Sequence, residues 1–306
     1  MKPSFVAKIA QLAAALEVSG YPKPGNVHRT QNFDDMSFED FIISAIVIGD
    51  TMKEAAERGA TLKGELDFSP LRIGNLMLKA VKETQKWVST NTNLGIIMLL
   101  TPLASAAAMV TEKDLQGLRE MVNKIMLQTT PQDAVDLYDA IAIAQPGGMG
   151  KKDQFDVNDE KSKDKILKEK VTLFDVLKLS SSWDLIAREL TSSMPITFNI
   201  GFPAFKETHQ ETDMNTAIVQ TFITILSNFP DTLIQRQHGK KIAEKVTNEA
   251  REVLDKGGML TEQGLKALKS LDRKLQKKGI NPGTTADLTA SSIMVGLIDY
   301  YGDKIR

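Results

Sequence analysis

The chain has 306 residues, of which 42% are hydrophobic, so it is long enough to fold around a sizeable core. Lys and Arg together number 38 and Asp and Glu 39, and the resulting net charge of −1 gives no reason to expect nucleic acid or an anionic membrane as a partner. There are no cysteines, which excludes disulfides, thiolate metal sites and a cysteine nucleophile, and with only three histidines acid–base chemistry would fall mainly to carboxylates.

Apolar residues recur along the chain at three- and four-residue spacing, which is the period of a helix with one buried face. The pattern covers residues 5–16, 41–52, 71–81, 118–125 and 185–190, and no alternation typical of strands accompanies it. The uncharged run 94–110 is too short to span a membrane and is predicted to be a buried core helix. The sequence therefore predicts an all-α fold, with a single multi-helix globular domain over residues 1–306 whose loops carry the functional site.

Helix starts are indicated where a Ser or Thr stands three residues before an Asp, the spacing of a capping box. These pairs are Ser37 with Asp40, Thr111 with Asp114, Thr172 with Asp175, Ser181 with Asp184 and Thr284 with Asp287. The stretch 151–170 is dense in mixed charge and is expected to be an exposed insertion. Residues 1–16 lack the features of a signal peptide, so we expect a cytoplasmic protein. The pattern leaves open whether apolar helix faces pack within the chain or across a homodimer interface.

A loop rich in proline and glycine follows the first predicted helix. Proline fixes φ and glycine permits positive φ, so Pro22, Pro24 and Gly25 can hold a shaped turn. The loop presents basic and polar side chains close to carboxylates, namely Lys23, Asn26, His28 and Arg29 with Glu17, Asp34 and Asp35. This arrangement suits a polyphosphate and the metal that screens it, although a solvated turn between two helices would have the same composition.

A second loop opens the predicted core helix. Asn91 and Thr92 supply an amide and a hydroxyl at the helix N-terminus, and Gly95 allows close approach. These groups suit an anion or a ribose hydroxyl, but ordinary helix capping explains the same residues.

A third loop precedes the last predicted helix. Pro282 and Gly283 set a tight turn, after which the free amides near Thr284 could cradle phosphate oxygens. Asp287 would repel phosphate unless a divalent cation lay between them, so a phosphate site here implies a metal; alternatively, Asp287 completes a capping box.

A weaker signal comes from Asp136 and Asp139, which share one face of a predicted helix, as solvated surface acids also do. The turn that follows contains Pro146, Gly147 and Gly148.

Taken together, these loops resemble those of the triphosphoribosyl-dephospho-coenzyme A synthase family. The matching positions, in order, are Glu17, the loop 22–29, Asp34, Phe38, Phe41, Arg72, Gly74, residues 91–95, residues 146–148, Asp231, Thr232, Pro282, Gly283, Ala286, Asp287 and Leu288. The resemblance implies an all-helical enzyme that transfers the triphosphoribosyl group of ATP to the 2′-hydroxyl of 3′-dephospho-coenzyme A and releases adenine. It also implies that the product is the precursor of a prosthetic group on an acyl-carrier subunit.

The resemblance and the chemistry together suggest roles for individual residues. Cleaving the glycosidic bond of ATP builds positive charge on the ribose, which carboxylates would stabilise. We expect Asp34, Asp35 and Asp287 to bind Mg²⁺, or Mn²⁺, with the triphosphate. The substrate contacts would come from Lys23, Gly25, Asn26, His28, Arg29, Arg72, Asn91, Thr92, Gly95, Gly147, Gly148, Gly283 and Thr284. Either Glu17 or Asp139 could act as the base on the acceptor hydroxyl.

Two departures from the family pattern keep other functions open. Many members have His-Lys where this chain has Asn93 and Leu94, and the closing loop commonly has a second glycine where this chain has Thr284. One alternative is a related helical transferase that acts on a different cofactor precursor, such as a pterin. Another is a non-catalytic helical nucleotide-binding protein.

Overall fold

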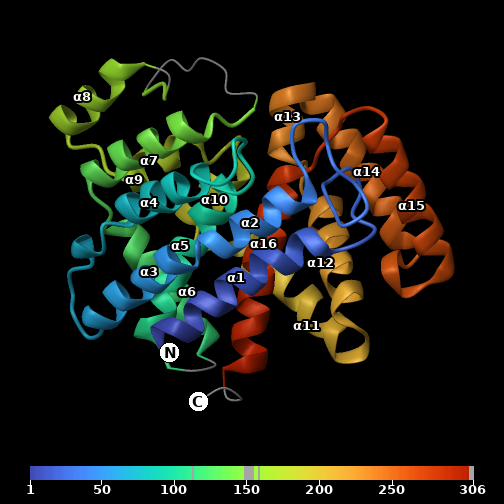
Figure 1. The fold of residues 1–306 in the computed structure, drawn as a ribbon, viewed down its shortest axis with the longest axis horizontal. Coiled ribbons are helices and arrows are strands. Elements are labelled where there is room, and N and C mark those ends of the chain that lie inside the picture. Colours follow the sequence, from blue (N-terminus) through green and yellow to red (C-terminus); the bar gives the residue numbers. More distant parts are fainter. Residues whose placement is uncertain (112–113, 148–154, 158, 303–306) are drawn as a thin grey trace. The chain divides into compact units, whose positions relative to one another are not determined.

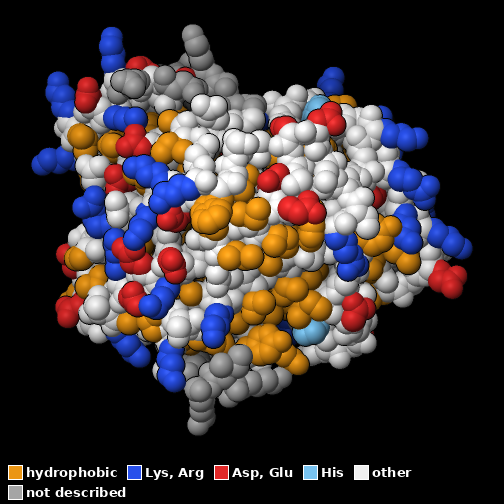
Figure 2. Space-filling view, viewed as in Figure 1, with side chains coloured by type: hydrophobic (Ala, Val, Ile, Leu, Met, Phe, Trp, Pro, Cys, Tyr) orange, Lys and Arg blue, Asp and Glu red, His pale blue; other side chains and the backbone are white. Residues whose placement is uncertain are grey.

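The computed structural model describes residues 1–111, 114–147, 155–157 and 159–302. These residues form helices joined by loops, and the described part of the chain contains isolated β-bridges but no strand (Figure 1). The all-α prediction is therefore confirmed. Charged side chains of both signs are present on the face shown in Figure 2.

The chain divides into two compact units. Unit 1 comprises Met1–Leu12, Ile43–Met194 and Leu297–Arg306, and unit 2 comprises Ala13–Ile42 and Pro195–Gly296. Three helices have residues in both units: α1 (Pro3–Ser19), α2 (Phe38–Val47) and α16 (Gly283–Tyr301). A single domain over residues 1–306 stays a prediction.

Unit 1 is built around one apolar helix. Its elements are α3 (Gly49–Thr61), the 3₁₀ turn η1 (Ser69–Leu71), α4 (Ile73–Gln85), α5 (Leu94–Met109), α6 (Leu115–Leu127), α7 (Pro131–Ala144), α8 (Glu160–Glu169), α9 (Leu173–Ser180) and α10 (Leu185–Thr191). Helix α5 packs against α3, α4, α6, α7 and α10, and all its residues except Gly95 are buried. The prediction of a buried core helix at 94–110 is confirmed. Helix α8 falls in the predicted charged insertion 151–170, part of which lies outside the described residues.

Unit 2 contains the π-helical turn η2 (Thr197–Gly201), α11 (Phe202–Glu211), α12 (Met214–Asn228), α13 (Thr232–His238), α14 (Lys240–Asp255), the 3₁₀ turn η3 (Gly258–Leu260) and α15 (Glu262–Gln276). Its core is an apolar cluster contributed mainly by α12, α14 and α15. Among the described residues no single helix is long and apolar enough to cross a membrane, although the bent pair α12 and α13 passes that test of length and composition when taken together.

The helix starts follow the capping prediction in part. Ser37 with Asp40 and Thr172 with Asp175 form reciprocal capping bonds, as predicted. The prediction is wrong at α6 and α10, because Asp114 and Asp184 are themselves the caps and accept the amides three residues further on. It is also wrong at Thr284, which lies inside α16 rather than before it.

Candidate functional site

The Pro22–Arg29 loop is enclosed in unit 2. Every residue from Pro22 to His28 is buried, and Arg29 and Thr30 are the first exposed ones. Gly25 has a φ of +71°, and a Cβ placed on it would lie 2.4 Å from the carbonyl oxygen of Ile280. The glycine is therefore required both by the left-handed backbone and by close packing, so the loop is not a solvated turn.

Asp272 of α15 binds this loop, and the sequence had not indicated that it would. Its Oδ1 accepts the Gly25 amide at 3.0 Å, and its Oδ2 lies 3.3 Å from Nε2 of His28. His28 and Asp272 are both buried. No local pattern marks Asp272, which sits in a helix of mixed charge, and it is 247 positions from Gly25 in the sequence.

Asn215 of α12 binds the start of the same loop, and the sequence had not indicated this residue either. Its side-chain amide exchanges two hydrogen bonds with the backbone of Tyr21, at 2.9 and 2.7 Å. Arg29 donates to the same amide oxygen at 3.2 Å and lies over the Tyr21 ring. The predicted phosphate ligand Arg29 is thus exposed, but its guanidinium is held in place.

The first and third sequence motifs meet in unit 2. Asn26 donates a hydrogen bond of 2.8 Å to the side-chain oxygen of Asn281, which precedes α16. Gly283 begins α16, and a Cβ there would lie 2.6 Å from a methyl group of Leu233. Two loops that the sequence predicted separately are therefore in direct contact.

Lys23 and Glu17 form a fully buried pair. The Lys23 ammonium donates to the Glu17 carboxylate and, at 2.9 Å, to the Glu17 carbonyl oxygen, and it lies over the Phe222 ring. Burial raises the pKa of Glu17 and lowers the pKa of Lys23, and the attraction between the two groups opposes both shifts. Asp287 adds a weaker attraction that raises the pKa of Lys23. Three predicted site residues are thus close enough to interact electrostatically, namely Glu17, Lys23 and Asp287.

Asp231 joins two helices of unit 2. Its Oδ1 accepts the amides of Leu233 and Ile234 at the start of α13, and its Oδ2 accepts the amide and hydroxyl of Thr285 in α16. Burial raises the pKa of Asp231, while these hydrogen bonds oppose the shift. The hydroxyl of Thr284, a predicted phosphate contact, accepts from Thr232 at 3.1 Å. Asp231 therefore supports the third motif from within the fold.

The predicted metal ligands are not gathered into a ready site. Asp34 and Asp35 are exposed, whereas Asp287 is half-buried. Within the described residues, no group of three or more His, Asp or Glu side chains is arranged to hold a metal ion. Binding of Mg²⁺ by Asp34, Asp35 and Asp287 stays a prediction.

The second motif lies in unit 1 and is used for capping and packing. The Asn91 side chain accepts the Leu94 amide at 3.1 Å, and the buried Thr92 hydroxyl lies 2.5 Å from that of Ser44. Asn93 is also buried and donates to the Thr84 hydroxyl at 3.1 Å. Gly95 follows in the first turn of α5. Asn93 and Leu94, which depart from the family pattern, are thus internal residues of unit 1.

The other predicted residues in unit 1 lie in α7, in the turn after it and at the start of α4. Arg72 pairs with Asp136 at 3.4 Å, and Asp139 pairs with Lys163 of α8 at 2.6 Å. Gly147 is exposed in a turn, and Gly148 lies outside the described residues. Arg72, Asp139 and Gly147 therefore all belong to unit 1.

Gly74 explains why α4 can lie so close to α7. A Cβ on Gly74 would lie 2.1 Å from the carbonyl oxygen of Asp133, so only glycine fits. The Asp133 side chain accepts the Gly74 amide at 3.0 Å and also completes a capping box with Thr130.

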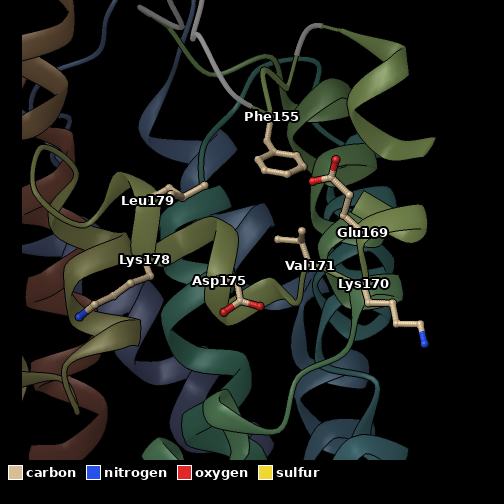
Figure 3. Close-up of a pocket in the computed structure, with 7 residues that line it drawn as sticks. All are labelled: Phe155, Glu169, Lys170, Val171, Asp175, Lys178 and Leu179. Atoms are coloured by element: carbon tan, nitrogen blue, oxygen red, sulfur yellow. The ribbon is translucent and has the colours of Figure 1, made fainter. Parts of the chain in front are cut away.

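A surface hollow of about 430 Å³ in unit 1 contains none of the predicted residues. It is lined by Phe155, Glu169, Lys170, Val171, Asp175, Lys178 and Leu179 (Figure 3). Asp175 is occupied in capping α9, and Lys170 and Lys178 point their amino groups away from the hollow. This hollow therefore offers no converging polar groups.

The all-helical fold and its motif loops can be compared with those of known protein families. The model of the family CitG, ATP:dephospho-CoA triphosphoribosyl transferase, matches residues 3–305. The chain belongs to the ATP:dephospho-CoA triphosphoribosyl transferase family.

Named relatives support this assignment along the whole chain. A protein of Malonomonas rubra named as a probable 2-(5''-triphosphoribosyl)-3'-dephosphocoenzyme-A synthase is 24% identical, covering 96% of this chain and 87% of the relative. A protein of Streptococcus equi subsp. zooepidemicus with the same name is 26% identical, covering 96% of each chain. Protein CitXG of Leuconostoc mesenteroides subsp. cremoris is 27% identical over 94% of this chain, which spans 57% of that longer protein.

A solved structure supports the fold. A crystal structure from Archaeoglobus fulgidus, titled as that of a putative triphosphoribosyl-dephospho-coA synthase, superposes with a TM-score of 0.65 at 28% sequence identity. The match covers 84% of this chain and 97% of the other.

Proposed function

We propose that this protein transfers the triphosphoribosyl group of ATP to the 2′-hydroxyl of 3′-dephospho-coenzyme A and releases adenine, for the biosynthesis of a prosthetic group. The observation that carries the proposal is the family match over residues 3–305. Relatives that bear the name of the synthase also match over nearly their full lengths.

The reaction exchanges one bond for another at C1′ of the ATP ribose. The bond from C1′ to the adenine nitrogen breaks, and a bond from C1′ to the 2′-oxygen of the acceptor forms. The acceptor hydroxyl loses one proton and adenine gains one, so a base and a proton donor are both required. Positive charge on the ribose in the transition state favours nearby carboxylates. The neighbourhood of Glu17, Lys23 and Asp287 in unit 2 supports such a role.

The divalent cation enters, on this proposal, as part of the substrate. Mg²⁺ is usually held by one or two carboxylates together with the phosphates of a nucleotide, so it does not need a protein cage. This agrees with exposed Asp34 and Asp35 and with the lack of a three-ligand group among the described residues. ATP and dephospho-coenzyme A are the proposed small-molecule partners, in the cytoplasm and without nucleic acid or membrane. A homodimer remains a prediction.

The test is acceptor-dependent release of adenine from Mg-ATP, with mass spectrometry of the acceptor. Adenine that appears only with dephospho-coenzyme A, together with a mass gain equal to the triphosphoribosyl group, supports the proposal. Release only with another acceptor, such as a pterin, would replace it with a related transferase, and nucleotide binding without any release would indicate a non-catalytic protein.

One variant pair links the activity to the third motif. Asp287→Asn should abolish adenine release while the circular dichroism spectrum stays that of the wild type. Glu262→Gln, which neutralises an exposed acid of α15 in the same unit, serves as the control and should remain active. Full activity of Asp287→Asn would exclude Asp287 from the site.

A further inference from the structure

A row of three side chains connects the interior of unit 2 to its surface. Asp272 Oδ2 lies 3.3 Å from Nε2 of His28, and Nδ1 of His28 lies 3.2 Å from the hydroxyl oxygen of Thr30. Asp272 and His28 are 5% and 1% exposed, whereas Thr30 lies at the surface. A carboxylate, an imidazole and an exposed hydroxyl thus stand in line within hydrogen-bonding distance, the arrangement that activates a hydroxyl in many unrelated enzymes.

The partners of His28 determine which ring nitrogen carries the proton. Nδ1 also faces the backbone amide of Thr30 at 3.4 Å, and an amide can only donate, so Nδ1 is the acceptor. The proton of the neutral ring is then on Nε2, where it points at the Asp272 carboxylate. In this form the single lone pair of Nδ1 is shared between the Thr30 amide at 3.4 Å and the Thr30 hydroxyl at 3.2 Å, and the hydroxyl is the nearer of the two.

The ring is held in this orientation by its surroundings. Asp272 is itself fixed, because its Oδ1 accepts from the Gly25 amide and from the Gln276 side chain at 2.8 Å. The Tyr21 ring packs edge-on against His28 with centroids 5.1 Å apart. The charged groups facing the imidazole are Asp272 and, across the Tyr21 ring, the Arg29 guanidinium. These contacts leave the imidazole in place to gain and lose a proton.

We propose that Asp272, His28 and Thr30 form a proton relay that deprotonates the acceptor hydroxyl, an inference that rests on the proposed function. The acceptor hydroxyl gives its proton to the Thr30 oxygen as the hydroxyl proton of Thr30 passes to Nδ1 of His28. The Asp272 carboxylate stabilises the imidazolium and is not itself protonated. The acceptor oxygen bonds to C1′ as adenine leaves. The proton on His28 returns through Thr30 to water, and adenine takes one proton from water, so the cycle balances.

Two features favour the relay over the carboxylates predicted from the sequence. Glu17 is engaged by the buried Lys23 ammonium, and Asp139 is paired with Lys163 in the other unit. The Thr30 hydroxyl, by contrast, is at the surface and next to the exposed cation of Arg29, which suits an acceptor that carries phosphate. Thr30 is accordingly the catalytic residue of the relay, His28 holds the proton, and Asp272 is a positioning residue.

The relay is tested first at Thr30, where substitution leaves the buried loop intact. Thr30→Val keeps the shape but removes the hydroxyl, and Thr30→Ser is the matched control that keeps it. Thr30→Val should lower kcat by about 10²- to 10⁴-fold, the usual contribution of a general base, with KM for ATP unchanged. Thr30→Ser should stay close to the wild type. Wild-type turnover by Thr30→Val would overturn the proposal.

Asp272→Asn tests the positioning role. The amide oxygen of asparagine can still accept from Gly25, but its NH₂ group would face Nε2 and move the ring proton to Nδ1. We expect the same loss of kcat as in Thr30→Val and no further loss when both changes are combined, because the two act on one relay. Losses that multiply in the double variant would contradict the relay and indicate a merely structural Asp272.

A third measurement does not depend on turnover. With only three histidines in the chain, ¹⁵N-labelled histidine gives few ring signals, and His28→Gln identifies those of His28. In the wild type Nε2 should carry the proton, and Asp272→Asn should move it to Nδ1. Thr30→Val, but not Thr30→Ser, should shift the Nδ1 signal. A proton on Nδ1 in the wild type overturns the relay, whereas failure to release adenine with correct ring signals overturns only the proposed function.

Discussion

Gly25 offers the sharpest test of how the motif loop is held. In Gly25→Ala the added methyl group would lie 2.4 Å from the carbonyl oxygen of Ile280 and 2.7 Å from the Cβ of Leu275. Neither atom is at the end of a flexible side chain, so the loop and the segment before α16 would have to separate. Because the Asp272 bond to the Gly25 amide depends on that approach, the whole loop should shift.

The magnitude follows from two contributions. A left-handed alanine costs about 1–2 kcal/mol relative to glycine, of which about 0.4–1 kcal/mol is returned by the stiffer unfolded chain. Forcing a methyl group into a packed site costs a further 1–3 kcal/mol, roughly. We therefore expect Gly25→Ala to lower the free energy of unfolding by about 1–5 kcal/mol.

Gly279→Ala is the matched control. Its φ is +60°, close to that of Gly25, but a Cβ there would meet nothing within 4 Å. The control should lose only the backbone contribution, about 1 kcal/mol or less. The assay is urea denaturation followed by helical circular dichroism, with hydrogen exchange of residues 275–281 as a local measurement. Equal losses in the two variants would refute the steric argument.

Three further changes test other parts of the fold. Asp231→Ala leaves buried amides of α13 and α16 without an acceptor. It should lower the free energy of unfolding, measured in urea, by about 2–4 kcal/mol. A loss under about 1 kcal/mol, the value of one ordinary hydrogen bond, would contradict the role of Asp231 in joining the helices. Gly74→Ala would place a methyl group 2.1 Å from the Asp133 carbonyl oxygen and should lower Tm, whereas an unchanged Tm would mean that α4 and α7 separate easily. Burial raises the pKa of Tyr138 to about 12 from 10.0. As the pH rises, the Tyr138 hydroxyl ionises in the unfolded chain before it ionises in the folded one, which favours unfolding. The difference in free energy of unfolding between the wild type and Tyr138→Phe should therefore be at its full value below pH 10 and be lost towards pH 12. A constant difference across this window would show the reasoning to be wrong.

The sequence by itself determined the helices and the class of protein. The spacing of apolar residues was enough to predict the all-α fold and the buried helix α5. A helix with a buried face has apolar residues at a regular spacing, whatever it packs against. Local hydrogen bonds were also readable, as at Thr172 and Asp175, where both partners lie within one turn. The order of the motif loops indicated the family, and the family match over residues 3–305 confirms it.

Only the tertiary structure decided how the loops are held. Asp272 bonds to Gly25 across 247 positions, and Asp231 bonds to Thr285 across 54, and neither spacing leaves a repeat that could be read. The sequence offered His28 as a phosphate ligand, whereas the fold encloses it between Asp272 and Thr30. Periodicity shows which face of a helix is buried, but the partner on that face is decided by packing between segments that are distant in the sequence. Asp272, His28 and Thr30 therefore come within hydrogen-bonding distance only in the folded protein.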